Sequence, residues 1–292
     1  MKLLAFETAT EACSVALWVD GEVRERFELA PRRHAELSLP WAEQLLAEAG
    51  IAKSQLDAIA VGRGPGAFTG VRLAIAIGQG IALALDRPIV PVSTLAALAM
   101  RAAAPSLAQG EGGDELMSRT ASGSPCGEER STGRGEEDRW QAIGLRTDER
   151  TAATPTGRTG WGGVKRVLAS IDARMKEVYL GRFELREGEA IALADETIVA
   201  PDAVYLPDDG CDWHGVGTGF AALDGRLRQR LADRLVTVDA DALPHAAEVA
   251  RLAVTAFARG EARAPEFVEP AYLRNHVALT IAEQQALRDS RG

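Results

Sequence analysis

Gly62-Arg63-Gly64-Pro65-Gly66 directly follows the apolar run Ala58-Ile59-Ala60-Val61, and a similar pentapeptide, Gly215-Val216-Gly217-Thr218-Gly219, recurs in the second half of the chain. Each pentapeptide precedes a segment with helical character. Glycines at a strand-to-helix turn allow the backbone to approach a neighbouring group closely, and phosphate is one such group. One G-x-G-x-G turn in each half therefore indicates two related lobes that face each other.

The segments that open the two halves also match. Leu3 to Val23 and Val167 to Glu189 each have the pattern of a strand, a polar turn, a second strand and a second turn. The second turn holds Asp20-Gly21 in the first half and Glu187-Gly188 in the second, and such dipeptides favour hairpins. The repeated order predicts an α/β protein of two duplicated lobes with a cleft between them.

Composition limits the class of protein. The chain has 292 residues and a formal net charge of −9, so it can bury a substantial core but is not expected to grip nucleic acid unaided. Cys13, Cys126 and Cys211 have neither disulfide-framework nor zinc-site spacing. No signal-peptide pattern and no apolar run of the roughly 20 residues needed to span a membrane is present. We therefore expect a cytoplasmic protein without a membrane segment.

The chain divides into four parts. Residues 1–104 are predicted to form the first lobe and residues 164–240 the second. Between them, residues 105–163 are rich in Gly, Ser, Thr, Glu and Arg and lack apolar periodicity, which predicts a low-complexity, disordered insertion. Residues 241–292 hold a helix near 246–258 and a tail, which we expect to pack back on the first lobe.

The first long helix is predicted over about residues 32–49, with a kink at Pro40. A surface helix needs one apolar stripe, and this helix has two. His34, Leu37, Trp41 and Leu45 form one stripe, and Leu39, Ala42, Leu46 and Ala49 form the other. We therefore expect one face to meet the core and the other, anchored by Trp41, to meet a partner.

The second long helix, over about residues 69–85, has a stripe of minimal side chains at four-residue spacing. The stripe consists of Gly70, Ala74, Gly78 and Ala82. Glycine inside a helix costs roughly 0.5–1 kcal/mol relative to alanine, so another backbone is expected close by. That backbone belongs either to the chain's own sheet or neighbouring helix, or to a partner subunit. With the first helix, this stripe is the predicted partner interface.

Two carboxylates occupy equivalent places in the halves, Glu7 after the first strand and Asp172 after its counterpart. In a two-lobed phosphotransferase such groups position metal and phosphate, so Glu7, Asp172, Gly64 and Gly66 are candidate nucleotide-binding residues. The alternative is that each carboxylate caps its local turn. Neither a P-loop nor a dinucleotide fingerprint is present.

No complete catalytic or metal-binding set occurs in the sequence. His34 would need a second histidine four residues later to place two ligands on one helical face, and that position is Ser38. The remaining histidines are scattered, and no G-x-S-x-G nucleophile elbow is present. We therefore predict no catalytic residue and no bound metal.

Five ordered motifs resemble one bacterial family. They are Leu4-Ala5-Phe6-Glu7-Thr8-Ala9-Thr10, Gly62-Arg63-Gly64-Pro65-Gly66-Ala67-Phe68-Thr69-Gly70-Val71-Arg72, Val92-Ser93-Thr94-Leu95, Ile171-Asp172-Ala173-Arg174-Met175 and Pro270-Ala271-Tyr272-Leu273-Arg274. Together they are similar to segments of the TsaB family, also called YeaZ. The resemblance covers both lobes and the tail but not residues 105–163.

The resemblance implies the actin/Hsp70/sugar-kinase (ASKHA) fold and a role in making threonylcarbamoyladenosine on tRNA, beside the 3′ end of the anticodon. It implies a non-catalytic subunit that pairs through helices of its first lobe with the catalytic paralogue TsaD. It also implies that an ATPase, TsaE, joins the complex and that the chain contacts tRNA only as part of the complex. A homodimer is expected when the partner is absent. ATP or ADP at the subunit interface is a further expectation. Older descriptions call the wider family glycoproteases, but the sequence holds no peptidase machinery.

One residue departs from the family pattern. The family usually has Asp where this chain has Glu7. The extra methylene would move the carboxylate away from the position that a metal–phosphate site requires. This departure lowers the expectation that the chain is a phosphotransferase acting in its own cleft, which is the alternative function.

Overall fold

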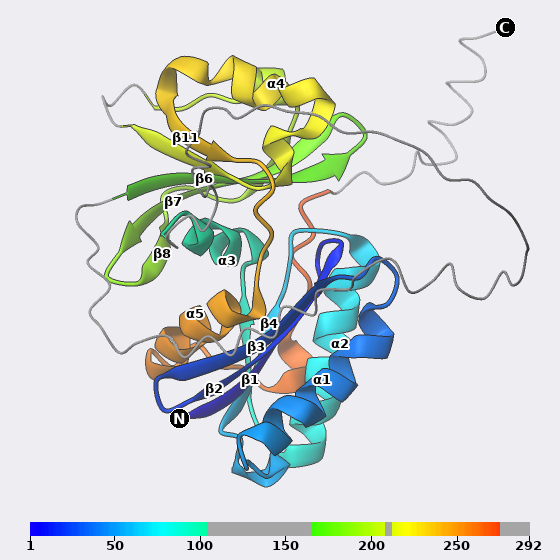
Figure 1. Cartoon of the computed structure of the whole chain (residues 1–292). Coiled ribbons are helices and arrows are strands. Elements are labelled where there is room, and N and C mark those ends of the chain that lie inside the picture. Colours follow the sequence, from blue (N-terminus) through cyan, green and yellow to red (C-terminus); the bar gives the residue numbers. More distant parts are fainter. Residues whose placement is uncertain (104–164, 208–211, 275–292) are drawn as a thin grey trace, which may run out of the picture. The chain divides into compact units, whose positions relative to one another are not determined.

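The computed structural model describes residues 1–103, 165–207 and 212–274 (Figure 1). The predicted insertion at 105–163 lies outside the described residues, as do Cys126 and Cys211. The described residues form two lobes, each built on one mixed sheet.

The first lobe contains β1 (Lys2–Glu7), β2 (Ala12–Val19), β3 (Glu22–Leu29), β4 (Ala58–Gly62) and β5 (Ile89–Val92), with α1 (His34–Glu48), α2 (Phe68–Leu85) and α3 (Thr94–Met100). The second part of the chain contains β6 (Lys165–Arg174), β7 (Glu177–Arg186), β8 (Glu189–Ala192), β9 (Thr197–Val199), β10 (Trp213–Val216), β11 (Leu235–Asp239), α4 (Ala222–Arg230) and α5 (Ala246–Ala258). Helix α1 runs through Pro40 as one element.

Two short strands share one edge of β7. β8 pairs with the end of β7, and β9 pairs with its beginning, at Val178 to Leu180.

The two sheets share one topology, which confirms the predicted duplication. The first sheet has the order β3-β2-β1-β4-β5, and the second has the matching path β8-β7-β6-β10-β11. In both, the first three strands form an antiparallel meander and the last two run parallel to the first strand. Parallel neighbours require crossover connections, which the long helix α2 supplies between β4 and β5.

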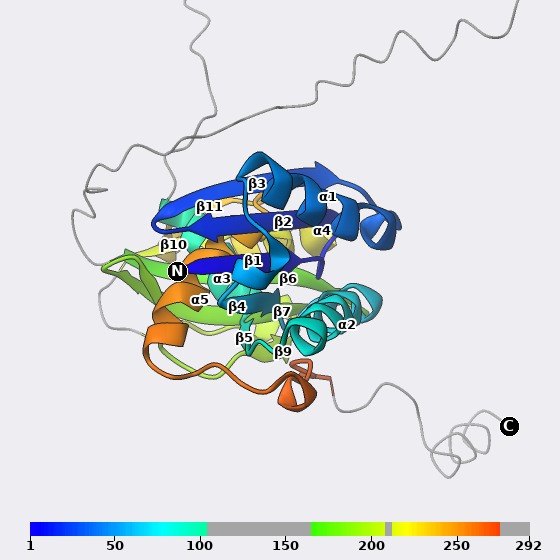
Figure 2. The ribbon, with the colours of Figure 1, turned by 90° about the horizontal axis from the view of Figure 1, so that it is seen from below.

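Alternation along β1 assigns its side chains to two cores. Leu4 and Phe6 point into the core under α1 and α2, whereas Leu3 and Ala5 point toward α5. The first sheet is therefore covered by helices on both faces, with α1 and α2 on one and α5 on the other (Figure 2).

The second sheet is covered by α3 on one face and α4 on the other. Helix α3 follows the first lobe along the chain but packs on the second sheet, and α5 follows the second sheet but packs on the first (Figure 1). This exchange ties the lobes together where α3 and α5 meet, since Ala97 of α3 lies in the core under α5.

Candidate functional site

The first glycine turn is packed tightly against the end of β1. A Cβ atom on Gly62 would lie 2.0 Å from Oε2 of Glu7, and one on Gly66 would lie 2.4 Å from the carbonyl oxygen of Ala9. Gly64 adopts a φ of +91°, which favours glycine. The turn therefore uses its glycines to approach the chain's own backbone and Glu7.

Glu7 is buried beneath this turn. Its Oε1 accepts a 2.8 Å hydrogen bond from the Ala9 amide, and its Oε2 accepts one of 2.9 Å from the Thr94 hydroxyl. Burial raises the pKa of the Glu7 carboxyl to about 7, although both hydrogen bonds act to lower it. The Glu7 carboxyl therefore occupies the space where Gly62 has no side chain and is held there by Ala9 and Thr94.

The second candidate turn is equally filled. A Cβ atom on Gly217 would lie 2.2 Å from the carbonyl oxygen of Ser170, and one on Gly219 would lie 2.0 Å from the Ser170 hydroxyl. Asp172 accepts a 2.9 Å hydrogen bond from the Arg174 amide and pairs with the Arg174 guanidinium at 3.1 Å. Asp172 therefore caps its local turn.

Glu7, Gly64, Gly66 and Asp172 therefore each make contacts within the chain. Nucleotide binding at these residues stays a prediction. His34 likewise contacts the Thr10 carbonyl through Nε2 at 3.0 Å. No group of three His, Cys, Asp or Glu side chains able to hold a metal occurs among residues 1–103, 165–207 and 212–274.

The small-residue stripe predicted to meet a partner faces the chain's own sheet. Ala74 and Ala82 are fully buried, and a Cβ atom on Gly78 would lie 2.4 Å from the Val61 side chain of β4. A Cβ atom on Gly70 would lie 1.9 Å from the Thr8 carbonyl oxygen. The assignment of Gly70, Ala74, Gly78 and Ala82 to a partner interface was therefore wrong, and the alternative of intramolecular packing is the one observed.

The predicted interface stripe of α1 is only partly buried. Leu45 is buried in the core under the helix, and Trp41 packs against that core while half-buried. Leu37 and His34 are also half-exposed. In the second stripe Ala42 and Leu46 are buried, whereas Leu39 is 48 % exposed. The assignment of the α1 stripe to a partner interface stays a prediction.

The apolar surface that sequence reasoning missed lies on the opposite side of α2. This outer face consists of Thr69, Leu73, Ala76, Gly80 and Leu83. Leu83 is 64 % exposed, and a Cβ atom on Gly80 would meet no atom of the described residues within 4 Å. By length and composition alone α2 could cross a membrane, but its other face is packed on the first sheet. In the sequence, the small residues Ala76 and Gly80, four positions apart, were the pattern that could have indicated this face.

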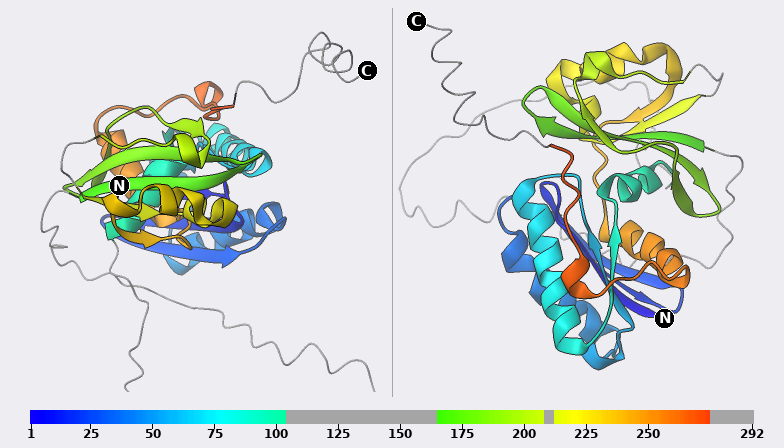
Figure 3. Two further views of the ribbon diagram at one scale, coloured as in Figure 1. Left: turned by 90° about the horizontal axis from the view of Figure 1, so that it is seen from above. Right: turned by 180° about the vertical axis from the view of Figure 1, so that it is seen from behind.

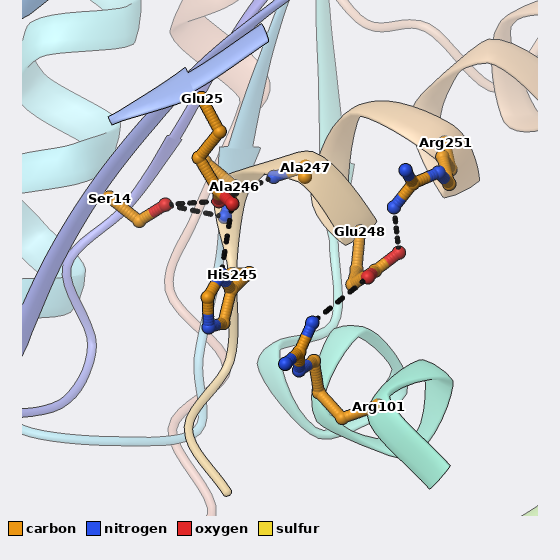
Figure 4. Close-up of polar contacts among 8 residues, drawn as sticks. All are labelled: Ser14, Glu25, Arg101, His245, Ala246, Ala247, Glu248 and Arg251. Atoms are coloured by element: carbon orange, nitrogen blue, oxygen red, sulfur yellow. Dashed lines mark hydrogen bonds and ion pairs between the residues drawn. The ribbon is translucent and has the colours of Figure 1, made fainter. Parts of the chain in front are cut away.

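A polar network fixes the start of α5 on the first lobe (Figure 4). The Glu25 carboxylate accepts hydrogen bonds from the Ser14 hydroxyl (2.6 Å) and the Ala247 amide (3.0 Å), and contacts His245 Nδ1 at 2.9 Å. The Ser14 hydroxyl also accepts a hydrogen bond from the Ala246 amide. Ser14 is fully buried and its proton is directed to Glu25, so this serine, histidine and glutamate do not form a hydrolase triad.

This network predicts an acid-sensitive contact. Burial opposes ionisation of Glu25, but His245, Ser14 and Ala247 together lower the pKa of its carboxyl. The stability that it contributes is therefore present above the unfolded-state pKa and lost as the pH falls through the folded-state pKa. At neutral pH we expect Glu25→Ala to lower the free energy of unfolding by about 2–3 kcal/mol, because three donors lose their acceptor.

The measurement is urea unfolding of both proteins between neutral and acidic pH. Glu22→Ala is the matched control, since Glu22 lies on the same strand and is exposed. Two results would contradict this role. One is an equal loss of unfolding free energy in the two variants, and the other is a loss in Glu25→Ala that does not become smaller at acidic pH.

The matching sheet topologies and the exchanged helices define a two-lobed α/β protein of the ASKHA class. Its two glycine turns pack against the chain's own backbone and side chains.

Comparison with known proteins identifies the family within this class. TsaB of Escherichia coli is 35% identical over 95% of this chain and 96% of its own length, and TsaB of Haemophilus influenzae is 31% identical over 95% of each. The structure of YeaZ from Pseudomonas aeruginosa superposes with a TM-score of 0.69 at 39% identity, covering 93% of this chain and 99% of that one. The chain belongs to the TsaB (YeaZ) family.

A second similarity is confined to part of the chain. Residues 28–111 match the family model of TsaD, described as tRNA N6-adenosine threonylcarbamoyltransferase. The matched span contains α1, α2 and α3. This region of the chain is therefore similar in sequence to the transferase family.

Proposed function

We propose that the chain is a non-catalytic subunit that supports formation of threonylcarbamoyladenosine on tRNA, at the adenosine 3′-adjacent to the anticodon. It pairs with the catalytic transferase of the TsaD kind through the outer face of α2, and the pair recruits an ATPase of the TsaE kind. The relatives named for tRNA threonylcarbamoyladenosine biosynthesis support the pathway. The filled glycine turns support the non-catalytic role.

Gly80 is the observation that carries the proposed interface. An exposed glycine in a helix interior costs roughly 0.5–1 kcal/mol relative to alanine. Gly78 on the opposite face has a packing reason for its missing side chain, but Gly80 has none within the described residues. A partner helix whose backbone approaches at Gly80 would supply that reason, since small residues permit close contact between helices.

The local similarity to the transferase family supports the same pairing. Both proteins would contribute related helices, because the matched residues 28–111 include α2. Related surfaces can meet about a pseudo-two-fold axis, as identical ones do in an isologous dimer. The same face therefore provides a homodimer when the transferase is absent, and we include adenine nucleotide at the heterodimer interface in the proposal.

The first test introduces a long charged side chain into the outer face. We expect Gly80→Arg to abolish pairing with the cognate transferase and to make the isolated chain monomeric, because arginine prevents close helix approach and exposes no core. Calorimetric titration and size-exclusion chromatography measure the two effects. Val236→Arg is the matched control, since Val236 is an exposed apolar residue of β11 in the other lobe.

Formation of the modified nucleoside connects pairing to function. Mass spectrometry of nucleosides measures tRNA modification by the transferase and the ATPase. We expect modification to require this chain, to proceed with Val236→Arg and to be lost with Gly80→Arg. Modification without the chain would overturn the proposed function. Normal pairing by Gly80→Arg would overturn the interface.

Two further additions to this assay address the alternative and the nucleotide. ATP consumption by the isolated chain that disappears with Glu7→Ala would favour phosphotransferase chemistry in its own cleft. Pairing that tightens on addition of ADP or ATP is the result expected from a nucleotide at the interface.

A further inference from the structure

Two exposed aromatic rings lie where the tail passes the first turn of α2. Phe68 is 60 % exposed and Tyr272 is 51 % exposed, with ring centroids 6.2 Å apart. The Arg72 guanidinium lies 3.7 Å from the centroid of the Phe68 ring, and its Nε donates a 2.6 Å hydrogen bond to the Tyr272 hydroxyl. We call Phe68, Arg72 and Tyr272 the tail cluster.

The part of the tail that presents this cluster runs along α2 of the first lobe toward the second sheet (Figure 3) and is held on each side of Tyr272. The Ala271 amide donates a 2.8 Å hydrogen bond to the Arg63 carbonyl in the first glycine turn. Three residues later, the Arg274 guanidinium binds the Glu177 carboxylate at 2.6 Å and the Ala173 carbonyl at 3.3 Å. Tyr272 is thus held between the two lobes, and its ring is positioned before any ligand arrives.

The surroundings of the cluster are cationic, although the whole chain carries a net charge of −9. Arg274 contacts the sulfur of Met175 in the hairpin between β6 and β7, and the neighbouring Arg174 and Lys176 are exposed. Asp172 pairs with Arg174, and Glu177 pairs with Arg274. No ion pair of Arg72 or Lys176 with a carboxylate is found in the part of the chain that the structure describes.

We propose that the tail cluster is an RNA-contacting surface, on which unpaired bases stack against Tyr272 and Phe68 while Arg72 and Lys176 face the phosphates. Exposed aromatic rings with interleaved arginine are the usual platform for single-stranded RNA, because every base has a stacking face and the backbone is anionic. A purely apolar protein partner would instead desolvate the charges of Arg72 and Lys176 without supplying a counter-charge. This inference rests on the proposed function, in which the RNA is the tRNA substrate and the bases are those of a loop.

The test measures tRNA affinity of the assembled pair, since the acidic chain alone is expected to bind weakly. The probes are a fluorescein-labelled, unmodified tRNA transcript and labelled oligouridine, titrated with the pair of this chain and its transferase and followed by anisotropy. We expect Tyr272→Ala to weaken binding of both probes roughly tenfold. Tyr272→Phe keeps the ring and is expected to bind as the wild type does.

Phe267→Ala is the matched control, because Phe267 is an aromatic residue of the same terminal segment that is 68 % exposed and lies outside the cluster. We expect it to leave tRNA affinity unchanged. Lys176→Gln is expected to reduce the slope of log Kd against log salt by about 0.7, the value for one phosphate of a single strand.

The affinity of this chain for the transferase subunit is measured in parallel for each variant. Unchanged tRNA affinity in Tyr272→Ala overturns the inference. So does weaker pairing with the transferase when the assembled complex binds tRNA normally, since the cluster would then be a protein contact. Neither result touches the proposed function, whose failure appears as modification that does not require the wild-type chain.

Discussion

Gly70→Ala is expected to lower the free energy of unfolding by about 3 kcal/mol or more, enough to unfold most of a marginally stable domain. The new methyl group would lie 1.9 Å from the carbonyl oxygen of Thr8 and 3.0 Å from its carbonyl carbon. Both are backbone atoms of the segment after β1, so they cannot rotate away. The Thr8 hydroxyl also donates a buried 2.7 Å hydrogen bond to the Gly70 carbonyl, and separation of the segments would break it.

Gly80→Ala provides the matched control on the same helix. Its methyl group meets no described atom within 4 Å, and its φ is not positive. We therefore expect a gain of about 0.5–1 kcal/mol from improved helix propensity. Urea unfolding of the isolated chain at low concentration measures both variants, and similar stability changes for the two would contradict the packing described for the inner face of α2.

Glu7→Gln is expected to change how stability depends on pH. The carboxyl has a pKa of about 7 in the folded chain and 4.5 as its ordinary value. Between these values the folded state holds a proton that the unfolded state has released. The contribution of the protonated Glu7 to the free energy of unfolding is therefore complete below about pH 4.5. It is lost as the pH rises through 7. By pH 8 the loss approaches about 3 kcal/mol.

Glutamine keeps the shape of the neutral acid and does not titrate. The free energy of unfolding of the variant should therefore rise relative to that of the wild type by about 3 kcal/mol between pH 4.5 and 8. Urea unfolding of both proteins across this range measures the difference, in which other titrating groups cancel. Glu22→Gln, an exposed change on β3, should show no such trend. A difference between Glu7→Gln and wild type that stays constant with pH would rule out a titrating Glu7.

Local sequence signals predicted most of the elements. The helix expected near 246–258 is α5 at Ala246–Ala258, and Ser93 caps α3 by accepting a hydrogen bond from the Ala96 amide. The matching openings of the two halves predicted the shared meander of both sheets. These features depend on residues that are close together in the chain, where periodicity and capping chemistry act.

The faces of α2 could not be predicted in the same way. Small residues lie on both sides of this helix, with Ala74 and Gly78 on one and Ala76 and Gly80 on the other. Their spacing shows that a backbone lies near but not which one, because that depends on the distant strand β4. The surroundings of Glu7 could not be predicted for a related reason, because Thr94, one of its two buried hydrogen-bond partners, is distant in the sequence.

The placement of α5 also affects how the chain folds as it is synthesised. One face of the first sheet, with Leu3, Ala5 and Ala60, is covered by a helix that ends at Ala258. The strands of that sheet are complete once Val92 has been made. At roughly 5–20 residues per second, the ribosome needs on the order of ten to thirty seconds to deliver the missing helix. During that interval the nascent first lobe exposes an apolar sheet face, which makes it a substrate for chaperones.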